Sequence, residues 1–213
     1  MFVDPYGTEA YDLFDSLEDL LIDWAKNYSS TSFYMGREVG SLIYYVEIDN
    51  YRMCGYVCAE IGISNNVKFD NTCSLVPKNA TVFATVHTHP AKESGDEEGL
   101  SEVDMRTVHS KGLNNNIYLE STFAVVNRGD TVAIYGYGTG VTPYEYDPKN
   151  PGHNKNYLPP KGTISSSDAE AYDTLLIEGI PIYGLSSERK AEIDKNVKDF
   201  EKRGWFNIYN EIL

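Results

Sequence analysis

Residues 81–90 read Thr81-Val82-Phe83-Ala84-Thr85-Val86-His87-Thr88-His89-Pro90, an apolar, β-branched run that ends in two histidines and a proline. Side chains alternate between the two faces of a strand, so His87 and His89 point to the same face and both imidazoles can reach one ion. Pro90 has no N–H to donate to a sheet and therefore ends the strand just past the second histidine. The segment predicts a strand that presents two metal ligands at its end.

A serine and an aspartate that lie three residues apart come after an acidic loop. Ser101 and Asp104 open a predicted helix over residues 101–111, with Ser101 as N-cap and Asp104 on the same side of the first turn. Asp104 thereby supplies a third, anionic ligand beside His87 and His89. A catalytic zinc site has three protein ligands and leaves the fourth tetrahedral position to water, whose pKa falls to roughly 7. The sequence therefore predicts one catalytic zinc ion per chain.

These two motifs resemble those of a known enzyme family. The JAMM metalloproteases, also called MPN-plus or JAB proteins, carry His-x-His-Pro followed by Ser-x-x-Asp, and the segments from His87 to Pro90 and from Ser101 to Asp104 resemble that signature. The family also carries a glutamate in a Glu-x-Gly element on an earlier strand, and the residues that begin at Glu38 are similar to it. The interval between the two motifs is longer here than the family usually has.

The resemblance covers roughly residues 10–137 and implies an α/β fold. The fold would be a mixed, largely antiparallel, curved β-sheet of the JAB/MPN (cytidine-deaminase-like) type, flanked by helices and followed by a C-terminal helical extension. The resemblance implies a junction segment (1–9) and a JAB-like metallopeptidase domain (10–140), and a shift in composition marks a Pro-rich connector with a helical extension (141–213). We expect helices over residues 8–28, 101–111, 167–177 and 186–203, strands over 39–48, 53–61, 81–86, 122–126 and 131–137, and an irregular connector over 142–162.

The resemblance also assigns roles at the site. Glu38 would be the general base that takes a proton from water and delivers it to the leaving amine, a transfer that contributes about 10² to 10⁴-fold. Glu47 and Glu60 also flank apolar runs and are the alternatives for this role. Ser101 would donate its hydroxyl to the developing oxyanion, or act as a helix cap, and the two roles can coexist.

Charge and cysteine content limit the classes of partner and site. There are 18 Lys and Arg residues against 32 Asp and Glu residues, and the resulting net charge of −14 repels phosphate backbones and anionic lipids, so we expect neither nucleic acid nor membrane as a partner. No apolar run approaches about 18 residues, so the chain as given is expected to be soluble. Cys54, Cys58 and Cys73 are odd in number and lack a CxxC pair; they are interpreted as core thiols, with one pairing of Cys54 or Cys58 left open but not favoured.

The first residues bear on biological context. Asp4-Pro5-Tyr6-Gly7 resembles the segment that closes the shell of RHS-repeat proteins, directly before their variable toxin domain. This resemblance implies a domain that is secreted or delivered into a target cell as part of a larger protein, with an immunity protein as partner.

The sequence supports two functions from different classes. The first is a zinc-dependent peptidase or isopeptidase that hydrolyses an amide bond in a protein or peptide substrate, as the effector domain of a polymorphic toxin. The second is a catalytically silent JAB-like domain that binds proteins. A lone His-x-His pair more often forms hydrogen bonds near a surface than it binds metal. The proline, the Ser-x-x-Asp motif and the upstream glutamate together favour the enzyme.

Overall fold

The computed structural model describes residues 12–62, 67, 69, 75–90, 99–101, 104–105, 108, 119–138 and 174–203; for 174 and 199–203 only the backbone is described. The junction segment 1–9, the connector 142–162 and Cys73 therefore lie outside the described residues. The same holds for most of the predicted helix over 101–111 and for the first part of the one over 167–177.

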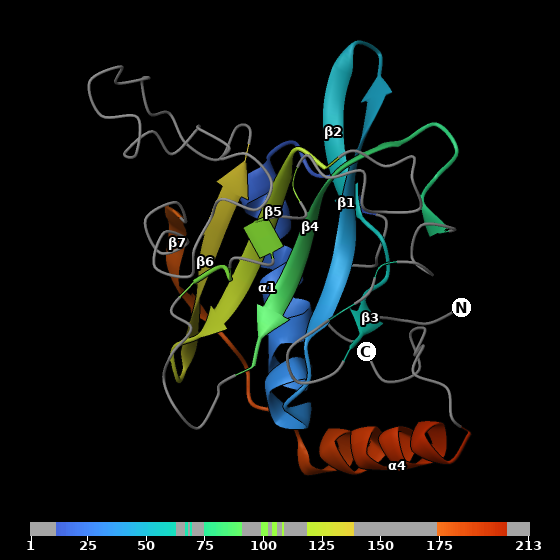
Figure 1. Cartoon of the computed structure of the whole chain (residues 1–213), viewed down its shortest axis with the longest axis vertical. Coiled ribbons are helices and arrows are strands. Elements are labelled where there is room, and N and C mark those ends of the chain that lie inside the picture. The colour runs from blue at the N-terminus through green and yellow to red at the C-terminus, as the bar shows by residue number, and fades with distance from the viewer. Residues whose placement is uncertain are drawn as a thin grey trace.

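One mixed β-sheet forms the centre of the molecule (Figure 1). Its strands lie in the order β2-β1-β4-β5-β6-β7, with β3 paired to β1 beside β2. Among these strands β4 and β5 run parallel and every other pairing is antiparallel. The bounds are β1 Val39–Ile48, β2 Tyr51–Tyr56, β3 Glu60–Ile61, β4 Thr81–His89, β5 Ser121–Asn127, β6 Thr131–Gly138 and β7 Thr174–Pro181. The helices are α1 Leu17–Met35 and α4 Ser187–Arg203, so the α/β class with a curved mixed sheet flanked by helices is confirmed.

Helix α1 covers one face of the sheet and is better bounded than the sequence indicated. Ser16 caps its N-terminus, where its hydroxyl accepts a hydrogen bond from the Asp19 N–H (3.1 Å). Gly36 ends it with φ at 62°, in the left-handed region that glycine adopts without strain. The prediction of a helix over 8–28 was therefore wrong at both ends. Residues 12–16 are not helical, because Phe14 pairs with Cys54 as an isolated bridge.

The hairpin of β1 and β2 turns through Asp49 and Asn50, both with positive φ, and projects beyond the rest of the sheet (Figure 1). The predicted strand over 53–61 is interrupted rather than continuous. Three residue steps on β1 from Gly40 to Ile43 face four on the partner from Tyr56 to Glu60, so one extra residue is inserted as a bulge. The bulge lets β3 pair again with β1 and places Glu60 opposite Gly40.

The main core lies between α1 and the sheet. Leu20, Trp24 and Tyr28 of α1 pack there against strand residues such as Val86 and Phe123. Two smaller clusters lie elsewhere in the described structure, one around Leu42 and Val57 and one around Met105 and Val126. Cys54 and Cys58 are buried in the reduced, thiol form, as expected for core cysteines. No helix within the described ranges is both long enough and apolar enough to cross a membrane.

The C-terminal segment differs from its prediction. Residues 174–177, expected to end a helix over 167–177, belong instead to β7, which pairs antiparallel with β6. Pairing with the exposed edge of β6 outweighs the helical pattern of this short apolar run. The helix predicted over 186–203 is confirmed as α4, with the Ser186 hydroxyl accepting from the Arg189 N–H (3.1 Å). Ile180 of β7 and Ile193 of α4 both enter the main core.

Candidate metal centre

Successive residues of strand β4 point to opposite faces of the sheet, and the two faces have different roles. Ala84 and Val86 point into the main core beneath α1, and Thr88 reaches Ser32 of that helix. The side chains of His87 and His89 therefore project from the opposite face of the sheet, and they are 3% and 6% exposed. The strand continues through both histidines and ends before Pro90, as the sequence indicated.

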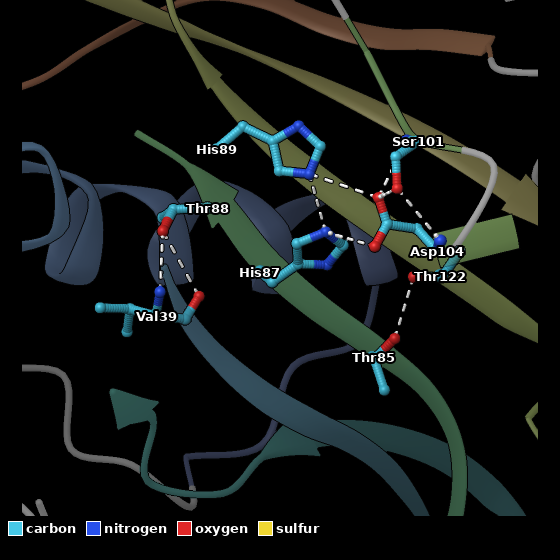
Figure 2. A network of polar contacts seen from close by, with 8 residues as sticks. All are labelled: Val39, Thr85, His87, Thr88, His89, Ser101, Asp104 and Thr122. Carbon is cyan, nitrogen blue, oxygen red and sulfur yellow. Dashed lines mark hydrogen bonds and ion pairs between the residues drawn. The ribbon is translucent and has the colours of Figure 1, made fainter. Parts of the chain in front are cut away.

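The structure brings the two histidines and Asp104 together (Figure 2). The Nε2 atoms of His87 and His89 lie 3.0 Å apart. Asp104 Oδ1 lies 3.2 Å from His87 Nε2, and its Oδ2 lies 3.3 Å from His89 Nε2. Among the described residues, these three form the one group of at least three His, Cys, Asp or Glu side chains whose ligand atoms all lie within 4.8 Å of one another.

These separations match the edges of a zinc coordination tetrahedron. Zinc binds imidazole nitrogen and carboxylate oxygen at about 2.0 to 2.2 Å, so two ligand atoms on one tetrahedron lie about 3.3 Å apart. The distance of 3.0 Å between the two Nε2 atoms is close to that length, and so are the distances of 3.2 and 3.3 Å from them to the two different carboxylate oxygens of Asp104. A neutral imidazole Nε2–H can donate to one acceptor, yet His87 Nε2 faces both His89 Nε2 and a carboxylate oxygen. A cation between these side chains can accept the lone pairs of both Nε2 atoms and of the Asp104 carboxylate at once.

Asp104 is oriented by the start of its own helical turn. The Ser101 hydroxyl and Ser101 N–H both donate to Asp104 Oδ2, at 2.7 and 2.8 Å, and the Asp104 N–H donates to Ser101 Oγ at 3.2 Å. Ser101 is thus the N-cap that the sequence predicted, and it also holds the carboxylate toward the histidines. Met105 packs in the cluster with Val126 of β5, which fixes this turn on the metal-facing side of the sheet. Because the hydroxyl proton is directed at Asp104, donation to an oxyanion stays a prediction.

The electrostatics of the group favour a cation. Burial of the Asp104 carboxyl opposes its ionisation, but the charge of His87 and the hydrogen bonds from His87 and His89 outweigh burial and hold the pKa of Asp104 well below its ordinary value. Asp104 is therefore a carboxylate at neutral pH, which is the form that ligates metal.

Glu38 lies at the same end of the sheet. Gly40 of β1 is directly opposite His87 of β4, and continuing that register by two residues places Glu38 opposite His89. Directly opposed residues of an antiparallel pair share a face, with Cβ atoms about 5 Å apart. Glu38 is 8% exposed, and its carbonyl accepts a hydrogen bond from the Gly62 N–H (2.8 Å). The predicted general base is thus buried at the end of the sheet that carries the histidines.

The two alternative glutamates lie in different places. Glu47 is on the projecting hairpin, where it pairs with Arg52 in solvent, about 23 Å along β1 from Gly40. Glu60 is buried and stands in one row with Gly40 and His87, two strand spacings or about 10 Å from His87 between Cα atoms. Position excludes Glu47 as the base and leaves Glu60 as the alternative.

Other polar contacts near the centre were not expected from the sequence. The Thr85 hydroxyl donates to the Thr122 hydroxyl (2.9 Å); Thr85 lies two residues before His87 on the same face of β4. Thr88, between the two histidines, bonds to the start of β1 and to α1 on the reverse face. Strand alternation signals that Thr88 faces away from the histidines, but no local pattern reveals its partners.

Comparison with models of known protein families finds no match to this sequence, and a search of curated proteins finds none. The chemistry available to the site is set by its residues. Two imidazoles and a carboxylate form an N₂O ligand set that suits zinc, and Glu38 is a further buried carboxylate of the kind that can accept a proton.

Proposed function

We propose that the protein is a zinc-dependent peptidase or isopeptidase of the JAMM (JAB/MPN-plus) type. The observation that carries this proposal is the convergence of His87 Nε2, His89 Nε2 and Asp104 at 3.0–3.3 Å, at the end of the sheet where Glu38 is also buried. His87, His89 and Asp104 would hold one zinc ion per chain. The resemblance of the Ser-x-x-Asp turn and the Glu-x-Gly segment to the family signature supports the same proposal.

The protein residues divide the work of amide hydrolysis between them. Bound zinc would lower the pKa of a water molecule to about 7 and polarise the substrate carbonyl. Glu38 takes a proton from the attacking water and later gives it to the leaving amine nitrogen, so the amide C–N bond breaks and an acid and an amine form. Ser101 keeps Asp104 in place, and its hydroxyl would donate to the developing oxyanion by turning its one proton away from Asp104.

The wider biological proposal rests on the N-terminal sequence. The resemblance of residues Asp4 to Gly7 to the closing segment of RHS proteins supports an effector domain delivered as part of a larger polypeptide. An immunity protein that neutralises it would present a basic face, because the chain carries a net charge of −14 and complementary potentials speed association. The substrate would be a protein or peptide.

The test combines metal analysis with substrate cleavage. Protein purified without chelator should contain one zinc ion per chain, and it should cleave members of a peptide library or a ubiquitin-like conjugate until chelator is added. His87→Ala and His89→Ala should contain no zinc. A wild-type chain that stays empty after reconstitution with zinc would refute the metal site. A zinc-loaded chain that cleaves no substrate would instead support the silent protein-binding domain.

A further inference from the structure

The residues on either side of Glu38 are held by a chain of buried hydroxyls. The Val39 N–H donates to Thr88 Oγ1 at 2.9 Å, and the Ser32 hydroxyl donates to the Arg37 carbonyl at 2.7 Å. Ser32 Oγ and Thr88 Oγ1 are themselves hydrogen-bonded. Both hydroxyl-bearing residues have no exposed surface.

The direction of these bonds is fixed by the proton count. A serine or threonine hydroxyl has one proton to donate. Ser32 gives its proton to the Arg37 carbonyl, so the proton between the two hydroxyls comes from Thr88. The order is therefore Val39 N–H to Thr88 Oγ1, Thr88 O–H to Ser32 Oγ, and Ser32 O–H to the Arg37 carbonyl. A longer 3.5 Å contact joins Thr88 Oγ1 to the Val39 carbonyl (Figure 2).

This chain connects three elements at one point. Ser32 lies in the last turn of α1, Thr88 in β4, and the peptide groups of Arg37 and Val39 bracket Glu38 where β1 begins. Two main-chain bonds complete the attachment: the Arg37 N–H donates to the Ser32 carbonyl (3.3 Å), and the Gly62 N–H donates to the Glu38 carbonyl (2.8 Å). The backbone that carries Glu38 is thus held from α1, from β4 and from the residue after β3.

Thr88 is also the residue between the two metal-facing histidines. Its side chain points to α1, while those of His87 and His89 point away from it (Figure 2). A bond from Thr88 to the start of β1 therefore fixes the offset between the strand that carries the histidines and the residue expected to act as base. A misplacement of about 1 Å between reacting groups can cost about 100-fold in rate, so a change in this offset should lower the rate of catalysis.

We infer that Ser32 and Thr88 are positioning residues: their hydroxyls form a clamp that sets Glu38 relative to the metal centre. The inference rests on the proposed function, because it takes Glu38 as the base. It assigns the two hydroxyls no contact with substrate or metal. Their loss should therefore impair proton transfer and leave the ligand set of His87, His89 and Asp104 intact.

The experiment compares Thr88→Val and Ser32→Ala with Thr88→Ser, which restores a hydroxyl, and with Ser29→Ala as a matched control. Ser29 is a fully buried serine one turn earlier in α1, and its hydroxyl has no hydrogen-bond partner among the described residues. Three quantities are measured for each: bound zinc, kcat and KM on a cleaved peptide, and the exchange rate of the Val39 amide proton by NMR.

Thr88→Val should bind one zinc per chain, exchange the Val39 amide proton at least about 10-fold faster, and lose about 10- to 100-fold in kcat with KM little changed. Ser32→Ala should change in the same direction, and it keeps the test open if Thr88→Val does not fold. Thr88→Ser and Ser29→Ala should resemble wild type. Wild-type kcat in Thr88→Val, or loss of zinc from it, would overturn the clamp.

Failure of the proposed function gives a different result. If wild type holds zinc but cleaves nothing, the assignment of Glu38 as base fails. The Val39 amide then decides the clamp by itself: an unchanged exchange rate in both Thr88→Val and Ser32→Ala would overturn it, and faster exchange in both with zinc retained would support it.

Discussion

Replacing Ser101 by alanine separates the two jobs that the structure gives to this residue. Asp104 Oδ2 accepts hydrogen bonds from the Ser101 hydroxyl and the Ser101 N–H, and the substitution removes the first. Loss of a hydrogen bond that orients a ligand typically costs about 10- to 100-fold in metal affinity, or about 1.4 to 2.7 kcal/mol. Loss of a serine N-cap costs about 1 kcal/mol of folding stability. Both effects should appear in Ser101→Ala.

The chain contains a matched control for this variant. Ser16 and Asp19 repeat the same local arrangement at the start of α1: the Ser16 hydroxyl donates to Asp19 Oδ2 (2.7 Å), and the Asp19 N–H donates to Ser16 Oγ (3.1 Å). Ser16→Ala should lose about 1 kcal/mol of stability as well, but its zinc affinity should be that of wild type.

Zinc affinity is measured by competition with a chromophoric chelator, and stability by denaturant unfolding of the zinc-free protein. Wild-type affinity in Ser101→Ala would refute the orienting role. An equal loss of affinity in Ser16→Ala would show that the effect comes through stability alone. At saturating zinc, a further fall in kcat of about 10² to 10³-fold in Ser101→Ala is what donation to an oxyanion predicts, and an unchanged kcat would leave only the orienting role.

Three further predictions concern the base, the metal and the alkaline limit of stability. Glu38→Gln should keep zinc and lose about 10² to 10⁴-fold in kcat, whereas Glu60→Gln should keep most activity; the reverse result would make Glu60 the base. Zinc at about 100 times its dissociation constant should stabilise wild type by about 2.7 kcal/mol in thermal unfolding, and His89→Ala should show no such gain. Burial, then the charges of Tyr28 and Asp23, raises the pKa of Tyr56 above its usual 10.0, so its stabilising contribution is present below pH 10 and is lost as the pH rises further. Tyr56→Phe should therefore flatten the alkaline fall in stability followed by circular dichroism, and an equally steep fall in both proteins would contradict this.

The sequence was most informative where local pattern and long-range structure agree. The histidine strand was predicted from period-two alternation and a terminating proline, and the strands predicted over 122–126 and 131–137 match β5 and β6. The helix predicted over 186–203 matches α4, whose Ile193 and Val197 pack against the main core. Each of these elements is defined by contacts within a few residues, or by one buried face, so a single sequence carries enough information to place it.

The errors have a common physical origin in contacts between distant residues. Helix α1 continues past Tyr28 because Ser29, Thr31 and Ser32 are buried against the sheet, which their polarity does not suggest. Strand β7 forms because β6 offers an unpaired edge, although its apolar run fits a helix equally well in isolation. Neither the sequence of α1 nor that of β7 by itself determines the order of the strands across the sheet.

The two Ser-x-x-Asp motifs show why a site needs more than its motif. Ser16–Asp19 and Ser101–Asp104 share two local hydrogen bonds, from the serine hydroxyl to the carboxylate and from the aspartate N–H to the serine oxygen, and each motif begins a helical turn. Only the second is packed by Met105 on the face of β5 beside the histidines, so Asp104 meets two imidazoles, which hold its pKa well below the ordinary value. Local chemistry sets the geometry of the carboxylate, and the strand that it faces decides whether that geometry caps a helix or also completes a metal centre.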